Sequence, residues 1–390
     1  MKYDFDKVID RHGTDCYKYD FAEEFGIPSE NLSLWVADMD FPTSSEVIEE
    51  IKKAADFGIF GYTSARDAYY QAVINWYKKH FDWEAKRDWI VPTPGVVFAL
   101  ATAVRSFTEA GDHVVIQRPV YYPFSNVIEN NGRVIENSPL VLRNGRYEID
   151  FEDLEAKLAK AESKMFILCS PHNPVSRAWS GDELVRIGEL CLKHGVILVS
   201  DEIHSDFVWG ERRHHVMASL DDRFLENVVV CTAPSKTFNL AGLQASNVFI
   251  PNSELRGKYL DTMDRTGYGM LNIFGLVACR AAYEKGEEWL SQVKEYIVGN
   301  IEFVREYLER ELPEIKLVET EATYLLWLDM RALGLSGEEL DDLIINRAHL
   351  WLDGGTMFGP EGAGFQRVNV ACSRSYLQKA MEQLKAAIDE

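Results

Sequence analysis

Three polar residues that could do chemistry follow apolar runs of the sequence. Asn173 lies in SPHNP just after MFILC, Asp201 lies in SDEIH just after VILV, and Lys236 lies in TAPSKTFNLAGL just after VVVC. They are separated by 28 and 35 positions, each about the length of one strand-helix-strand unit. Ligands of an open parallel sheet bind at the carboxyl ends of its strands, so an amide, a carboxylate and an amine are expected at one edge.

This combination of groups has a specific chemical meaning. A carboxylate at a buried strand end is costly unless a cation pairs with it, and desolvation makes a buried lysine amine easier to deprotonate. Pyridoxal phosphate needs a lysine that captures its carbonyl group, an acid that keeps its ring nitrogen protonated and a donor to its phenolic oxygen. Lys236, Asp201 and Asn173 supply the three groups, although each alone could be an ordinary polar residue at a strand end.

The elements that must position these residues alternate between apolar runs and amphipathic stretches. Strands buried on both faces are predicted for HVVIQRP (113–119), KMFILCS (164–170), GVILVSD (195–201) and NVVVCTA (227–233). Residues 151–162 and 181–195 have the leucine and isoleucine spacing of helices. The alternation predicts an α/β fold with a mostly parallel sheet between helices.

The pattern changes toward the C-terminus. Long helical stretches are interrupted there by ATYLLWLDM (322–330) and FQRVNVA (365–371), which is typical of a smaller α+β domain. We therefore predict a large domain over residues 46–285 and a small domain formed by residues 1–45 and 286–390.

Composition limits the classes of partner. The chain has 390 residues, with 41 Lys and Arg against 62 Asp and Glu, which gives a net charge of −21. This balance argues against nucleic acid and anionic membranes, because both need a basic surface. No apolar run reaches the ~18 residues of a membrane span, and the six cysteines are scattered without CxxC spacing. A reducing, cytoplasmic location is predicted.

Several motifs resemble those of a known superfamily. SPHNP, SDEIHSDF (200–207) and APSKTFNLAGL (233–243) resemble the cofactor motifs of fold-type I pyridoxal-phosphate enzymes, the aspartate aminotransferase superfamily. Further segments are similar to one branch, the MalY/PatB type of cystathionine and cysteine-conjugate β-lyases. These segments are WVADMDFP (35–42), GYTSARDAY (61–69), TPGVVFAL (93–100), RPVYYPF (118–124) and DGGTMFGPEGAGFQRVNVACSR (353–374). The resemblance runs from about residue 30 to the C-terminus.

The resemblance implies a role for each cofactor residue. Lys236 would bind the cofactor covalently, Asp201 would hold its ring nitrogen and Asn173 would donate to its phenolic oxygen. His204 falls where many relatives place a tyrosine beside that oxygen, the alternative being a structural histidine on a turn. Tyr121 matches the aromatic residue that stacks on the cofactor ring, a role that its π surface explains.

The phosphate of the cofactor is expected at the start of a helix, where free amides and the helix dipole favour an anion. The residues that fit this position as helix-start amides, or that could add hydroxyl donors, are Gly95, Val96, Val97, Ser235 and Thr232. Tyr62, in GYT, resembles the tyrosine that reaches the phosphate of a neighbouring subunit. That role implies a homodimer.

The carboxylate of an amino-acid substrate calls for a planar cationic fork, so arginine is the expected residue. Arg367, in FQRVNVA, has the position used for this in the superfamily, the alternative being a surface arginine on an edge strand. Trp35, Asp38 and Tyr324 are expected to line the substrate pocket, although the two aromatic residues could equally be core residues.

Some residues depart from the family pattern. Gln244 stands where many relatives have an arginine that holds the phosphate, and Ser176 stands where the branch usually has glycine. Ser176 is therefore expected to alter the loop beside Asn173 and the substrate preference. The pair His214 and His215 has no carboxylate or cysteine at metal-ligand spacing, so no metal is predicted and the pair is assigned to a solvated loop.

The favoured activity is β-elimination from L-cystathionine or a related cysteine S-conjugate, which yields a thiol, pyruvate and ammonia. Two alternatives remain. Transamination between an amino acid and a 2-oxo acid uses the same lysine, aspartate and arginine, and some members of the branch also act through protein partners while they retain the cofactor. The resemblance favours the carbon–sulfur lyase.

Overall fold

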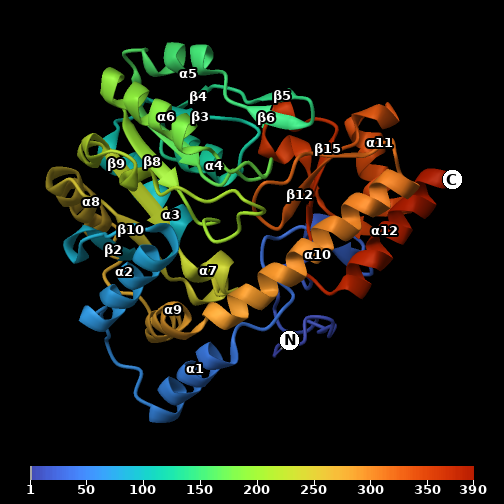
Figure 1. Ribbon diagram of the computed structural model, residues 1–390, viewed down its shortest axis with the longest axis horizontal. Coiled ribbons are helices and arrows are strands. Elements are labelled where there is room, and N and C mark those ends of the chain that lie inside the picture. The colour runs from blue at the N-terminus through green and yellow to red at the C-terminus, as the bar shows by residue number, and fades with distance from the viewer. Residues whose placement is uncertain (1) are drawn as a thin grey trace.

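A seven-stranded sheet carries the residues singled out above in this computed structural model, which describes residues 2–390 (Figure 1). In their order across the sheet, the strands are β2 (Ile90–Thr93), β10 (Ser246–Phe249), β9 (Val228–Thr232), β8 (Ile197–Asp201), β7 (Ser163–Cys169), β3 (His113–Ile116) and β4 (Val134–Asn137). β10 pairs antiparallel with both of its neighbours, β2 and β9, and every other neighbouring pair in this sheet is parallel. The predicted mostly parallel sheet is confirmed, and all four apolar runs are strands.

Helices cover both faces of this sheet. They are α1 (Ser45–Phe57), α2 (Asp67–Phe81), α3 (Val96–Phe107), α4 (Pro123–Glu129), α5 (Phe151–Leu158), α6 (Gly181–His194), α7 (Pro234–Thr237), α8 (Ser253–Arg265) and α9 (Ile273–Lys285). In β9, Val228 and Val230 pack into the core that includes α5 and α6, whereas Val229 and Cys231 pack into the core that includes α3 and α8. Alternate side chains of one strand therefore face two cores, which is why the run is apolar throughout.

Local sequence signals explain where the predicted helices begin and end. In α6, the Ser180 hydroxyl accepts the amide of Glu183 while the Glu183 side chain accepts the amide of Ser180, so both groups at the helix start are satisfied. Gly195 ends the helix with a left-handed φ of 65°. In α5, the Asp150 side chain caps the amides of Glu152 and Asp153.

A second, four-stranded antiparallel sheet lies toward the C-terminus. Its strands, in spatial order, are β11 (Lys316–Leu317), β12 (Leu325–Asp329), β15 (Phe365–Asn369) and β14 (Asp353–Gly354). Its helices are α10 (Glu287–Glu311), α11 (Gly337–Asp342) and α12 (Arg374–Asp389). Two short ladders complete the strands: β1 (Leu32–Ser33) with β13 (Leu350–Trp351), and β5 (Val141–Arg143) with β6 (Arg146–Glu148). The long helix α10 begins beside α9 and ends beside α12, so it joins the two sheets (Figure 1).

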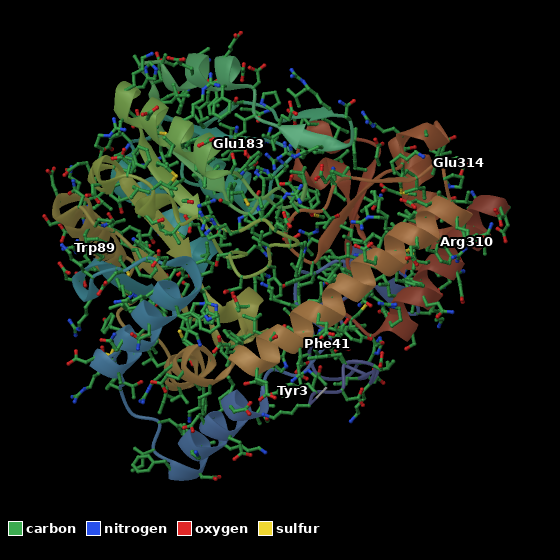
Figure 2. The ribbon with its side chains drawn as sticks, in the orientation of Figure 1. Tyr3, Phe41, Trp89, Glu183, Arg310 and Glu314 are labelled. Atoms are coloured by element: carbon green, nitrogen blue, oxygen red, sulfur yellow. The ribbon has the colours of Figure 1, made fainter. Side chains whose placement is uncertain are left out.

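The N-terminal segment packs on the C-terminal elements. β1 pairs with β13, and Phe41 meets both Phe5 and Tyr296 of α10 at ring-centroid distances of 5.0 and 5.5 Å; Figure 2 labels Phe41 beside this helix. Between α9 and α10, Gly286 allows a close approach, since a methyl group there would lie 2.4 Å from the ring of Phe238. The segments are thus interlocked around the two sheets.

Among residues 2–390, no helix is both long and apolar enough to cross a membrane.

The predicted solvated loop is wrong for His214. This residue is buried, and its ring Nε2 lies 2.8 Å from a carboxylate oxygen of the buried Glu202. This partner, twelve positions away, explains how a polar ring is tolerated in the interior.

Candidate active site

A cavity of about 420 Å³ opens at the carboxyl ends of β7, β8 and β9. The predicted residues that line it are Lys236, Asp201, Asn173, His204, Tyr121, Gly95, Val96, Val97 and Ser235. The register of the sheet explains the convergence, since Asp201 pairs with Cys169 on one side and with Cys231 on the other. The ends of three neighbouring strands therefore lie level: Asp201 is the last residue of β8, and Asn173 and Lys236 follow β7 and β9.

Lys236 lies on α7, directly after β9. Burial lowers the pKa of its amine to about 8, with the nearby Asp38 opposing the shift. Nζ donates a hydrogen bond of 2.7 Å to the carbonyl of Ala37. The lysine is thus an amine that loses its proton readily and is held by one side-chain hydrogen bond, to the carbonyl of Ala37.

The residue after the lysine is held from behind by a carboxylate that sequence reasoning missed. The Thr237 hydroxyl donates to Oδ2 of Asp206 at 2.6 Å, and the indole of Trp76 donates to Oδ1 at 3.2 Å. Asp206 also accepts a bond from Lys294 at its backbone carbonyl. The position of Lys236 is therefore fixed through its neighbour by contacts to α2 and α10.

Asp201 is the acid of the cavity. Burial raises the pKa of its carboxyl to about 7, and the amide of Ile203 donates to Oδ1 at 3.1 Å. No second donor reaches this carboxylate from residues 2–390, so one oxygen is free on the cavity side. A buried carboxylate with a free oxygen is the partner that a protonated pyridine nitrogen requires, so the residues present fit pyridoxal phosphate.

Asn173 has a defined orientation. Nη1 of Arg367 donates to its Oδ1 at 2.9 Å, and a guanidinium group has no acceptor atom. The amide oxygen must therefore face Arg367, which leaves the NH₂ group of Asn173 to donate into the cavity that it lines. This is the donor expected for a phenolic oxygen.

His204 lies in the wall as a neutral ring. Burial, together with the charges of Lys236 and Arg367, holds its pKa well below the usual value. Its Nδ1 is buried and has no hydrogen-bond partner within residues 2–390, and its ring meets the edge of Tyr324 at 6.0 Å. An orphaned polar atom beside the cavity fits a role toward a bound group better than a purely structural one.

The start of α3 provides the predicted anion position. The amides of Val96 and Val97 belong to the first helical turn, which has no partners within the helix, and Gly95 adds no side chain in front of them. Ser235 also lines the cavity, but Thr232 does not, because its hydroxyl donates to the carbonyl of Asn247 within the sheet. Gln244 lines the cavity in a left-handed conformation, so the position of the missing arginine faces the site.

The residues predicted for the substrate lie behind the cavity wall. Arg367 is buried, contacts the carboxylate of Asp353 and donates to the carbonyl of Trp35 at 2.9 Å. Its positive charge is therefore already balanced before any substrate binds. Asp353 was missed by sequence reasoning, although a buried guanidinium requires such a partner.

The two aromatic residues are core residues, which is the alternative stated for them. Trp35 stacks on Trp351 at a centroid distance of 4.3 Å. Tyr324 is fully buried, and its hydroxyl donates to the carbonyl of Ala37 at 3.0 Å. Asp38 also lies outside the cavity lining and forms an ion pair with Arg11 at 2.6 Å.

Two other predicted positions lie away from the cavity. Tyr62 is 98% exposed, so its side chain contacts nothing substantial in its own chain. Ser176 has a positive φ of 56°, and its hydroxyl donates to the carbonyl of Leu325 at 2.6 Å. This serine therefore ties the loop after Asn173 to β12 and does not line the cavity itself.

Comparison with known proteins agrees with the geometry. Residues 30–384 match the aminotransferase class I and II family. The chain is 46% identical to cystathionine beta-lyase PatB of Bacillus subtilis over 98% of this chain and 99% of that protein. It is 34% identical to MalY of Escherichia coli over 99% of both chains. The crystal structure of cystalysin from Treponema denticola, which contains pyridoxal 5'-phosphate, superposes with a TM-score of 0.97 at 38% identity, covering 100% of this chain and 99% of that one.

The fold and the site thus define a fold-type I enzyme of the pyridoxal-phosphate class, and the chain belongs to the aminotransferase class I and II family. Within that family it is similar to carbon–sulfur lyases of the PatB/MalY type.

Proposed function

We propose that the protein is a pyridoxal-phosphate-dependent carbon–sulfur β-lyase that cleaves L-cystathionine or related cysteine S-conjugates to a thiol, pyruvate and ammonia. The observation that carries this proposal is the convergence of Lys236, Asp201 and Asn173 on one cavity, in a chain 46% identical to a cystathionine beta-lyase.

The residues divide the work of such a reaction. When bound, pyridoxal phosphate supplies an electron sink for the charge that develops at the substrate Cα. Lys236, with an amine pKa of about 8, takes the Cα proton as general base. Asp201 would hold the ring nitrogen of the cofactor through its free carboxylate oxygen, and Asn173 would donate to the phenolic oxygen, since both line the cavity. Tyr121, also in the lining, would pack on the cofactor ring, and the amides at the start of α3 would bind the phosphate.

The substrate carboxylate is assigned to Arg367. The Arg367 guanidinium lies behind Asn173 and is hydrogen-bonded to its amide oxygen. A small movement of the Asn173 side chain would therefore present Nη1 of Arg367 to the cavity. The ion pair with Asp353 would keep the guanidinium oriented during this movement. Expulsion of the thiolate from Cβ then follows removal of the Cα proton.

The test is turnover of L-cystathionine by the holoenzyme in the absence of any 2-oxo acid. Pyruvate formed in proportion to time supports the lyase, and the Lys236→Ala variant should form it at least about 100-fold more slowly. Turnover only after 2-oxoglutarate is added would overturn the lyase in favour of an aminotransferase. Bound cofactor with neither activity would favour a regulatory protein that retains it.

A homodimer is the second part of the proposal. Phe57, Ile59, Phe60 and Tyr62 are more than 60% exposed within one short segment, and an apolar patch of this kind is typical of an interaction surface. A second copy of the chain is the proposed occupant, with Tyr62 reaching the phosphate of the neighbouring site. Light scattering should give twice the chain mass of 44.5 kDa for the wild type, and Phe60→Asp should reduce it. A monomeric wild type would contradict the assignment.

All six cysteines are unpaired, which supports the cytoplasm as the compartment.

A further inference from the structure

A second cavity, of about 500 Å³, lies between the end of α2, the segment that follows β8, and α10. It shares no lining residue with the candidate active site. Its volume falls within the roughly 300–1,000 Å³ typical of small-molecule sites. The exposed apolar residues of the proposed dimer surface also do not line it, so neither the reaction nor the dimer accounts for it.

The lining of this cavity is unusually basic for so acidic a chain. Its basic residues are Lys79, His80, Arg212, Arg213, His214, His215 and Lys294, and its acidic residues are Asp82 and Asp206. With neutral histidines the lining carries four positive charges against two negative ones, while the whole chain carries −21. A concave surface with a local excess of positive charge attracts anions.

Two of these cations lack a carboxylate partner. Lys79 pairs with Glu287, and Arg212 pairs with Glu319 at 2.6 Å. Within residues 2–390, no carboxylate lies within ion-pair distance of Arg213 or Lys294. Their charges therefore remain available to a ligand.

Lys294 is the more informative of the two. Its ammonium group donates to the backbone carbonyl of Asp206 at 2.5 Å, and burial lowers its pKa. A partly buried ammonium without a carboxylate is destabilising, and an anion beside it would remove that cost.

The acidic residues of the lining offset only part of this charge. Both carboxylate oxygens of Asp206 accept bonds from Thr237 and Trp76, and although the charge of Asp206 acts on Lys294, the two form no side-chain ion pair; Asp82 is exposed at the end of α2. The same Asp206 braces Thr237, the neighbour of Lys236. A ligand in this cavity would thus lie against the support of the catalytic lysine.

We propose that this cavity is a second binding site, which takes a small multivalent oxyanion. Ligand oxygens would accept charge-assisted hydrogen bonds from the Lys294 ammonium and the Arg213 guanidinium. A phosphate group and a dicarboxylate share this chemistry, and the experiment separates them.

The holoenzyme is titrated with inorganic phosphate and, separately, with succinate, by isothermal calorimetry in a buffer without other multivalent anions. Saturable binding of at least one probe is expected, and the tighter probe identifies the source of the oxyanion. The Arg213→Ala, Lys294→Met double variant should bind it at least about tenfold more weakly, because two charged hydrogen-bond donors are removed. Lys258→Ala is the matched control, since Lys258 is an exposed cation on α8 outside this cavity, and its affinity should equal that of the wild type.

Three results would overturn the proposal: no saturable binding of either probe, unchanged affinity in the double variant, or binding abolished by a saturating amino-acid substrate, which would locate the anion in the active site. Circular dichroism and cofactor absorbance establish that the variants are folded. If the double variant does not fold, Arg213→Ala alone carries the test. Arg213 is exposed, and a several-fold loss of affinity is expected for it.

Discussion

The cofactor side and the substrate side of the candidate site are built in different ways. On the cofactor side, Asn173, Asp201 and Lys236 follow adjacent strands of one sheet, and each presents a hydrogen-bonding group or an amine to the cavity. On the substrate side, Arg367 lies in β15 of the second sheet and Tyr324 directly precedes β12, and their polar groups are already bonded to other parts of the chain.

The difference shows that the side chains on the cofactor side line the cavity, whereas those on the substrate side are hydrogen-bonded within the chain outside it. The carbonyl of Ala37 illustrates the connection, since it accepts bonds from both Lys236 and Tyr324. The cofactor groups lie level at the ends of neighbouring strands and face the cavity, whereas binding of a substrate by Arg367 must exchange bonds that already exist. Substitutions on the two sides should therefore differ in size and in the kinetic constant that they change.

The largest effect is expected for Lys236→Ala, because this change removes the proposed general base. Pyruvate formation from L-cystathionine should fall by about 10²- to 10⁴-fold, the range for loss of acid–base catalysis, and the covalent attachment of the cofactor should be lost. Reduction with borohydride followed by mass spectrometry measures the attachment. Lys258→Ala, at an exposed lysine, serves as control. A Lys236→Ala enzyme that retains its activity would contradict the assignment of Lys236 as the general base.

A smaller effect is expected for Arg367→Lys, on the substrate side. Lysine cannot replace the fork that contacts Asn173, Asp353 and the Trp35 carbonyl together. We expect the transition-state stabilisation that kcat/KM reports to fall by about 2–3 kcal/mol, mainly because KM rises. Asp353→Asn, which keeps the arginine but removes its counter-charge, should have a smaller effect on KM. A fall in kcat alone would place Arg367 with the catalytic residues instead.

The third prediction concerns stability and pH in the enzyme without cofactor. The pKa of Asp201 is about 7 in the fold against an ordinary value of 3.8, so between these values the native state binds a proton that the unfolded state has lost. The contribution of Asp201 to the stability of the apoenzyme should therefore fall as pH rises from about 4 to about 7, by on the order of 1–4 kcal/mol.

Thermal or urea unfolding of the apoenzyme and the holoenzyme across this range measures the effect. The difference in stability between the wild-type apoenzyme and Asp201→Asn isolates this contribution, because the buried His172 and His204, whose pKa values burial lowers, act in the opposite direction in both proteins. Bound pyridoxal phosphate should reduce that difference by pairing with the carboxylate. Lys236 does not confuse the result, since its pKa is lowered from 10.5 to about 8, a range above this window. An apoenzyme that becomes more stable from pH 4 to 7 in an Asp201-dependent way would contradict the assignment.

The same contrast explains how much the sequence could predict. Strand-end residues are predictable because an apolar run fixes both the strand and the point where it ends, as for Asn173 and Asp201. Asp206 was missed because its partners Thr237 and Trp76 are 31 and 130 positions away, and no local pattern reveals them. Whether Trp35 lines a pocket or stacks in a core depends equally on a distant partner.

The smallest effect is expected for Tyr324→Phe. The ring remains buried, and only the hydrogen bond to the carbonyl of Ala37 is lost, which should cost about 0.5–1.5 kcal/mol of stability. KM for L-cystathionine should stay within about twofold of the wild type, because the hydroxyl does not line the cavity. Urea unfolding of the apoenzyme measures the change in stability, and there the carbonyl of Ala37 retains its bond from Lys236. A large rise in KM with unchanged stability would show that Tyr324 contacts the substrate, which would contradict its assignment to the core.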